Sequence, residues 1–196
     1  LGSANAALKS LAEKGMVSNG AINAEGKEAL SPFKVDNAII MAAGLSSRFA
    51  PISYEKPKGL LRVRGEVLIE RQIKQLKEAG INDITVVAGY KKEYFFYLED
   101  TFGVTIVINP EYASRNNNST LMRVREKLCN TFICSSDDYF TENPFEPYVY
   151  QAYYAAQFCK GETPEWCIKE GPNKRIAGVT IGGSDSLIML GHVYFD

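Results

Sequence analysis

Residues 41–61 read MAAGLSSRFAPISYEKPKGLL, and this stretch decides the fold class. It continues an apolar run that begins at Asn37, starts with small residues, and contains Arg48 and Lys58. Small residues after a strand let the backbone approach a ligand closely, and open parallel sheets bind ligands where such loops leave the strands. The stretch therefore predicts a strand followed by a loop that holds phosphate.

The sequence around this stretch alternates short apolar runs with helical patterns. In the first helical pattern Leu68, Ile69, Ile73 and Leu76 share one face, and Gly80 ends the helix. Continuous apolar strands that alternate with helices are typical of a parallel sheet covered on both faces. We therefore expect a Rossmann-like, doubly wound α/β domain with a mostly parallel sheet. The expected strands are 37–41, 84–87, 104–108 and 131–134, and the expected helices are 66–79, 91–101 and 119–128.

Both ends of the chain depart from this pattern. Residues 1–35 predict a small helical appendage, with a turn at Asn19 and Gly20 and a linker from Pro32 to Val35. The rest, 36–196, is expected to form one larger domain. The helices expected in the appendage are 4–14 and 24–30. After Asp137 we expect one long helix, about 146–160, and three strands that complete the sheet, 166–168, 176–181 and 188–195.

Composition excludes several classes of function. The 196 residues include 22 basic and 23 acidic side chains, so no global field would recruit nucleic acid or an anionic membrane. No apolar stretch approaches the roughly 18–20 residues that span a bilayer. The four cysteines lack C-x-x-C spacing and no secretory signal precedes them, so we expect a cytoplasmic protein with reduced cysteines.

Arg48 and Lys58 are candidates for phosphate binding. A guanidinium can bind two phosphate oxygens at once, and Pro57 fixes the backbone beside Lys58 so that its ammonium can reach the same phosphates. The sequence has neither the G-x-x-x-x-G-K-[ST] pattern of a P-loop nor the G-x-G-x-x-G pattern of a dinucleotide fold. The alternative interpretation is a tight strand-to-helix turn followed by a solvated basic turn.

Two carboxylates, Asp137 and Asp138, follow the apolar strand expected at 131–134. At the carboxyl end of a strand, carboxylate oxygens can bind Mg²⁺ while a triphosphate supplies further oxygens. The cation would also offset repulsion between two phosphate-bearing substrates. An Asp-Asp pair in this position can instead serve as a helix cap or a turn.

AAGLSSRF at 42–49, followed by KPKGLL at 56–61, resembles the signature of nucleotidyltransferases, which join a nucleoside triphosphate to a phosphate monoester and release pyrophosphate. The resemblance implies that Arg48 holds the β- and γ-phosphates and that Lys58 neutralises charge on the α-phosphate during attack. It implies that Asp137 binds the Mg²⁺ cofactor and that Asp138 flanks it. It also implies that the first residues of the loop wrap around the nucleotide; these are Ala42, Ala43 and Gly44.

From Asn37 to about Phe195 the chain resembles the branch that uses CTP and phosphocholine, the bacterial phosphocholine cytidylyltransferases. The resemblance implies a nucleotide-diphospho-sugar transferase-like fold and an enzyme that forms CDP-choline. In the most branch-like stretch, 109–119, Asn118 and Ser119 can bind a pyrimidine edge or ribose, or cap the next helix. The other residues expected at the nucleotide are Ser46, Ser47, Ala88 and Gly89.

The acceptor phosphocholine carries a quaternary ammonium, which aromatic faces recognise because it cannot donate an N–H hydrogen bond. Packing is the ordinary role of any single aromatic residue. The only histidine, His192, lies in an apolar strand, where we expect a hydrogen-bonded core residue. The aromatic candidates for the acceptor contact, all near expected strand ends, are Tyr112, Tyr139, Trp166 and Tyr194.

Two other functions are open from the sequence: transfer to a sugar phosphate or another phosphate monoester, and a nucleotide-sensing DNA-binding regulator. Residues 1–30 resemble the second half of a winged helix-turn-helix. Only Lys9, Lys14 and Lys27 are basic there, so packing or homodimer formation is favoured over DNA binding. The family resemblance also implies a second metal carboxylate late in the fold, and we expect it beyond Asp196, in a domain that is incomplete at its C-terminus.

Overall fold

The structure is a computed structural model that describes residues 2–115 and 117–196, with the side chain of Arg48 outside the description. Its first elements are a helix, a hairpin and a second helix, as expected. Asn23 starts the second helix, because its side-chain oxygen accepts a hydrogen bond from the backbone of Gly26 at 3.0 Å. The winged helix-turn-helix assignment of this unit stays a prediction. The elements are α1 (Gly2–Glu13), β1 (Val17–Ser18), β2 (Ala21–Ile22) and α2 (Ala24–Leu30).

The linker predicted at Pro32 to Val35 is wrong from Phe33 onward, because these residues are hydrogen-bonded to the segment around Pro147. The backbone N–H of Val35 donates to the carbonyl of Pro147 at 3.0 Å, and that of Val149 donates to the carbonyl of Phe33 at 2.8 Å. The side chain of Val35 is buried. A free linker would leave these groups to water, so the segment is part of the larger unit.

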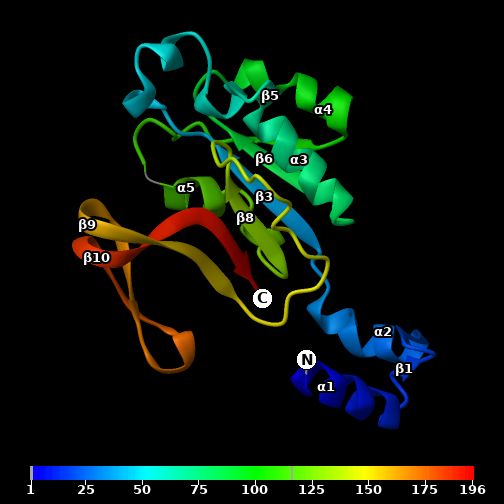
Figure 1. Ribbon diagram of the computed structural model, residues 1–196. Coiled ribbons are helices and arrows are strands. Elements are labelled where there is room, and N and C mark those ends of the chain that lie inside the picture. Colours follow the sequence, from blue (N-terminus) through cyan, green and yellow to red (C-terminus); the bar gives the residue numbers. More distant parts are fainter. Residues whose placement is uncertain (1, 116) are drawn as a thin grey trace.

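A six-stranded sheet in the order β7-β6-β3-β8-β10-β9 forms the centre of the larger unit (Figure 1). Its first four strands in that order pair in parallel, whereas β10 pairs antiparallel with both β8 and β9. The chain runs outward from β3 to β6 and β7 and then returns to the other side of β3. This reversal is a switch point at which α/β sheets bind ligands. The strands are β3 (Asn37–Ala42), β6 (Ile84–Ala88), β7 (Thr105–Ile108), β8 (Thr131–Ser135), β9 (Tyr153–Glu170) and β10 (Ile176–Phe195).

Helices cover both faces of the parallel strands (Figure 1). α3 (Leu68–Glu78) and α4 (Tyr97–Phe102) contribute to the same buried cluster as Ile40 of β3. Ile39, the preceding residue, lies in a second cluster on the opposite face, against which Leu121 of α5 (Asn117–Met122) packs. Successive strand residues point to opposite faces, so one apolar strand contributes side chains to the core on both sides of the sheet. The doubly wound, Rossmann-like fold is confirmed.

The three helices between the strands are shorter than expected. α3 begins at Leu68 because Glu66 and Val67 form β5, which pairs with β4 (Arg62–Val63). Gly80, with φ +83°, follows the end of α3 as predicted. The segment expected at 91–101 divides into a 3₁₀ turn and α4, and the one at 119–128 into α5 and a 3₁₀ turn. Among the described residues, no helix is both long enough and apolar enough to cross a membrane.

The long helix expected at about 146–160 is wrong. The described chain has no helix there, and from Tyr153 it forms β9, which pairs with β10 as a long antiparallel ribbon. The segment contains Pro147 and many aromatic residues, which favour extended structure, and pairing with β10 outweighs its weak helical spacing. The three short strands expected after it are parts of these two long strands.

Candidate functional site

Two loops meet at the carboxyl ends of β3 and β8, beside the switch point. The backbone N–H of Ser136 donates to the carbonyl of Met41 at 3.1 Å. A Cβ atom on Gly59 would lie 2.7 Å from Ser136 Oγ, so a glycine is needed for this close approach. The loop after β3 therefore folds back against the loop after β8.

A cleft of about 420 Å³ lies between the two loops. Lys58 Nζ and Asp137 Oδ2 form an ion pair across it at 2.8 Å, and the two side chains are 28% and 23% exposed. The backbone N–H of Lys58 also donates to Ser46 Oγ at 3.3 Å, which ties the two ends of the β3 loop together. The cleft is lined by Gly44, Leu45, Ser46, Ser47, Phe49, Lys58, Asn117 and Asp137.

The first residues of the loop have a structural role. Ala42 and Ala43 are buried, and the carbonyl of Ala43 accepts a hydrogen bond from the backbone of Tyr90 at 3.3 Å. Gly44 and Ser47 are exposed and line the cleft. The predicted phosphate contact of Arg48 falls on a side chain outside the described part of the structure.

Asp137 and Asp138 differ in their surroundings. Burial and, second, the neighbouring Asp137 raise the pKa of Asp138 to about 6, while the Lys58 ammonium and a hydrogen bond with the backbone of Ser135 lower it. Asp137 Oδ1 and Asp138 Oδ2 are both buried and have no hydrogen-bond partner among the described residues. Unpartnered buried carboxylate oxygens are costly unless a cation or a donor joins them.

Of the two carboxylates, only Asp137 lines the cleft, so its oxygens suit a magnesium ion that is shared with a ligand. Mg²⁺ prefers carboxylate oxygens and is usually bound by one or two of them together with substrate phosphates. Within the described ranges, no group of three or more His, Cys, Asp or Glu side chains could hold a metal ion by itself. Any cation bound beside Asp137 would therefore need further oxygens from a ligand such as a phosphate.

Ala88 and Gly89, predicted at the nucleotide, lie at the end of the neighbouring strand. Ala88 is fully buried, and a Cβ atom on Gly89 would lie 2.7 Å from both the carbonyl oxygen of Ala43 and Tyr112 Cβ. Gly89 and Tyr112 line a second hollow of about 350 Å³. The structure thus places these three residues beside the cleft rather than in it.

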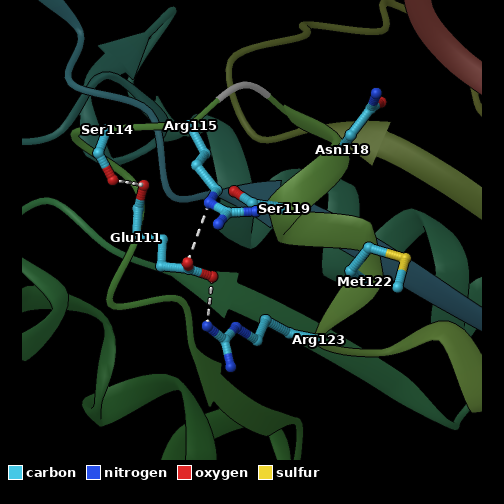
Figure 2. A pocket seen from close by; sticks show the side chains of 7 residues that line it. All are labelled: Glu111, Ser114, Arg115, Asn118, Ser119, Met122 and Arg123. Carbon is cyan, nitrogen blue, oxygen red and sulfur yellow. Dashed lines mark hydrogen bonds and ion pairs between the residues drawn. The ribbon is translucent and has the colours of Figure 1, made fainter.

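Asn118 and Ser119 line a third hollow, of about 700 Å³ (Figure 2). Ser119 is buried and accepts a hydrogen bond from Asn109 Nδ2 at 3.1 Å, so it fixes the start of α5. Asn117 is the residue of this stretch that lines the cleft; it lies within the expected nucleotide-binding stretch 109–119, but Asn118 and Ser119 were selected instead. The run of asparagines was the available signal, but which of them faces the cleft depends on where α5 begins.

Three of the four aromatic candidates lie apart from one another. The ring of Tyr139 contacts the guanidinium groups of Arg71 and Arg64, with centroid distances of 4.9 and 5.9 Å. Trp166 lies on the ribbon and is 52% exposed. Tyr194 is fully buried and donates to Asn130 Oδ1 at 3.2 Å, at the amino end of β8. Tyr194 is far along β8 from the cleft because β10 runs antiparallel to β8.

His192 is a hydrogen-bonded core residue, as expected. Its Nε2 lies 2.8 Å from the hydroxyl of Tyr153, and its ring stacks on Phe132 with a centroid distance of 5.4 Å. Burial lowers its pKa to about 4. It therefore stays neutral at neutral pH and supports the pairing of β8 with β10.

The chain is similar in sequence to two bacterial cytidylyltransferases. The choline-phosphate cytidylyltransferase of Streptococcus pneumoniae is 36% identical over 159 residues, which are 81% of this chain and 69% of that protein. The 2-aminoethylphosphonate cytidylyltransferase of Lancefieldella rimae is 39% identical over 163 residues, 81% of this chain and 66% of that protein. The chain thus spans about two thirds of the length of both relatives.

Solved structures show the same fold. That of the CTP:phosphocholine cytidylyltransferase from Streptococcus pneumoniae superposes with a TM-score of 0.78 at 36% identity, covering 82% of this chain and 70% of that one. UDP-glucose pyrophosphorylase superposes with a TM-score of 0.62 at 14% identity, covering 82% and 76%, and supports the fold alone. Residues 38–142 match the family of MobA-like NTP transferase domains. The chain belongs to this family, in the group that includes bacterial cytidylyltransferases.

Proposed function

We propose that the protein is a Mg²⁺-dependent cytidylyltransferase that forms CDP-choline and pyrophosphate from CTP and phosphocholine. The observation that carries the proposal is the Lys58–Asp137 pair, 2.8 Å apart at the carboxyl ends of β3 and β8, in a chain 36% identical to a choline-phosphate cytidylyltransferase. The Lys58 ammonium can neutralise phosphate charge directly, and the Asp137 carboxylate can hold a metal ion that binds the same phosphate. A triphosphate substrate requires both kinds of charge neutralisation.

In this reaction an oxygen of the acceptor phosphate attacks the α-phosphorus of CTP, the bond from that phosphorus to the bridging oxygen breaks, and pyrophosphate leaves. Lys58 neutralises the charge that builds on the α-phosphate, and the protein supplies no nucleophile. Bound Mg²⁺ would neutralise phosphate charge and orient the triphosphate. Asp137 would hold the ion, and its buried Oδ1 is the oxygen available for this role because Oδ2 pairs with Lys58.

The loop after β3 is the proposed triphosphate site. Gly44, Ser46 and Ser47 offer backbone N–H groups and hydroxyls at the cleft, and Arg48 remains our candidate for the β- and γ-phosphates. Asn117 is added as a candidate for the nucleotide because it lines the same cleft. Asn118, Ser119, Ala88 and Gly89 stay predictions as nucleotide-binding residues.

Trp166 is the aromatic candidate that suits the acceptor best, because its half-exposed ring can meet a quaternary ammonium. A second acceptor is favoured by a specific observation, the 39% identity to a 2-aminoethylphosphonate cytidylyltransferase. That acceptor carries a primary ammonium, which requires hydrogen-bond acceptors as well as an aromatic face.

Acceptor profiling with CTP and Mg²⁺ tests the proposal. Pyrophosphate release is measured with phosphocholine, 2-aminoethylphosphonate and a sugar 1-phosphate, and the product is identified by mass. We expect the highest kcat/KM with phosphocholine. A preference for the phosphonate would select the second acceptor, and a preference for the sugar phosphate would refute both. DNA binding that responds to CTP, without turnover, would make the protein a regulator.

The N-terminal unit is proposed to pack or to form a homodimer rather than to bind DNA. No residue of α1 is buried, and Leu8 and Leu11 are exposed on it. Sedimentation of the protein with and without a Leu8→Lys change separates the two alternatives. A homodimer formed through α1 would sediment as a dimer in the wild type and as a monomer in the variant, whereas packing within one chain gives a monomer in both.

A further inference from the structure

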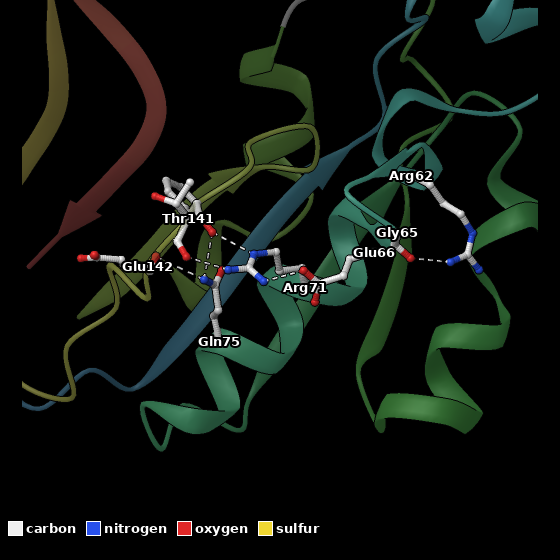
Figure 3. A network of polar contacts seen from close by, with 8 residues as sticks. Arg62, Gly65, Glu66, Arg71, Gln75, Thr141 and Glu142 are labelled. Atoms are coloured by element: carbon white, nitrogen blue, oxygen red, sulfur yellow. Dashed lines mark hydrogen bonds and ion pairs between the residues drawn. The ribbon is translucent and has the colours of Figure 1, made fainter.

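Helix α3 presents three polar side chains to the loop that carries the two aspartates. Arg71 donates to the carbonyls of Phe140 and Thr141 at 2.8 and 2.9 Å, and its guanidinium is held in turn by Glu66 at 2.6 Å (Figure 3). The other two are Gln72 and Gln75.

Gln72 forms hydrogen bonds to the backbone on both sides of Asp137. Its Nε2 donates to the carbonyl oxygens of Ser135 and Asp138, both at 2.8 Å. An amide nitrogen has two hydrogens, so both are used. The side chain is 1% exposed, which excludes competition from water. The amide thus links the backbone two residues before Asp137 to the backbone one residue after it.

The carboxylate of Asp137 has little else to fix its position. Its Oδ2 binds Lys58, a long and partly exposed side chain, and its buried Oδ1 has no hydrogen-bond partner among the described residues. The direction in which Asp137 projects is therefore set by the backbone of Ser135 to Asp138. Gln72 is the side chain that spans this turn.

We propose that Gln72 is a positioning residue for the metal-binding carboxylate: it holds the β8 turn so that Asp137 Oδ1 points to the cation. This inference rests on the proposed Mg²⁺ role of Asp137. Groups that orient metal ligands through hydrogen bonds typically change metal affinity by about 10–100-fold when they are replaced.

The helix provides a matched control. Gln75 lies one turn further along α3, is 5% exposed, and also donates through one amide nitrogen to two carbonyls, those of Phe140 and Glu142 at 3.3 and 3.2 Å. These carbonyls are three and five residues beyond Asp137. Loss of the Gln75 amide should therefore affect folding without moving the carboxylate.

The experiment compares Gln72→Met with Gln75→Met, because methionine keeps the length of the side chain and removes both donors. Two quantities are measured for each protein: the midpoint of urea unfolding, and the affinity for Mn²⁺ in the presence of CTP, by electron paramagnetic resonance. We expect both midpoints to fall. We expect the Mn²⁺ affinity to fall about 10–100-fold in Gln72→Met and to stay at the wild-type value in Gln75→Met.

Each outcome decides the inference. Equal Mn²⁺ affinity in Gln72→Met and wild type, or an equal loss in both variants, would overturn it while leaving the proposed function intact. No Mn²⁺ binding by the wild type with CTP would overturn the metal role of Asp137 and the inference together. If Gln72→Met does not fold, Gln72→Asn, which keeps the amide but withdraws it by one methylene, is measured in its place with the same expected loss.

Discussion

Acidification should destabilise the protein through His192, which pairs with Cys134 where β10 meets β8. The imidazole is 4% exposed and lies against the ring of Phe132 and the hydroxyl of Tyr153. Burial lowers its pKa from 6.5 to about 4. A charged imidazole at this position would lack the hydration that stabilises it in the unfolded chain.

The sign and the size follow from the two pKa values. Between pH 6.5 and 4 the unfolded chain binds the proton and the folded chain does not, so the free energy of unfolding rises with pH in this window. The stabilisation is complete above pH 6.5 and is lost as the pH falls to 4. A shift of this size corresponds to about 3 kcal/mol in full and to about 2 kcal/mol at about pH 5.

Urea unfolding of the wild type and of His192→Gln, each at about pH 7.5 and about pH 5, measures this contribution. Carboxylates such as Asp138 titrate in both proteins and cancel in the comparison. The wild type should lose about 2 kcal/mol more than the variant on acidification, which corresponds to about 4–8 °C in Tm. An equal loss in both proteins would refute the assignment of His192 as a neutral, buried group.

Three further changes test the close approach of the two loops, the packing of β10 on β8, and the proposed metal role of Asp137. Gly59→Ala places a Cβ 2.7 Å from Ser136 Oγ and should displace Lys58 from the cleft. We expect kcat for pyrophosphate release to fall by about 10²-fold while the far-UV circular dichroism spectrum stays unchanged. Full activity would contradict the close approach of the two loops. Gly191→Ala places a Cβ against Ser135 Oγ and 2.6 Å from Ser135 Cβ, and should lower the free energy of unfolding in urea by about 1–3 kcal/mol; an unchanged free energy of unfolding would contradict this close packing of β10 on β8. Asp137→Asn should abolish CTP-dependent Mn²⁺ binding in calorimetry, whereas retained binding would exclude Asp137 as the ligand.

The parallel part of the fold was predictable from local pattern. Three of its strands, β3, β6 and β8, are buried on both faces and appear as continuous apolar runs. The strand Thr131–Ser135 differs from the expected one by a single residue. The antiparallel ribbon was predictable only in short pieces, because its full length depends on pairing between distant residues such as Tyr153 and Tyr194. A segment with mixed spacing takes its conformation from its partner, and the helix expected at 146–160 failed for that reason.

The residues of the candidate site also fall into those that local pattern predicts and those that depend on distant contacts. Lys58 and Asp137 meet as expected, because loops at the carboxyl ends of neighbouring parallel strands converge on one edge. Gln72 was missed because its partners are backbone carbonyls 63 and 66 residues away. Two glutamines beside the apolar face of a predicted helix were the available signal, since a buried amide needs a partner.

The rate of pyrophosphate release by Lys58→Ala, compared with Lys56→Ala, tests nucleotidyl transfer at this cleft most directly. The two lysines flank Pro57, but Lys56 lines a separate hollow with Tyr94 and Tyr97. We predict that Lys58→Ala lowers kcat by about 10²–10³-fold, as expected for loss of a group that stabilises transition-state charge, while Lys56→Ala keeps the wild-type rate. Pyrophosphate release at the wild-type rate by Lys58→Ala would contradict the account.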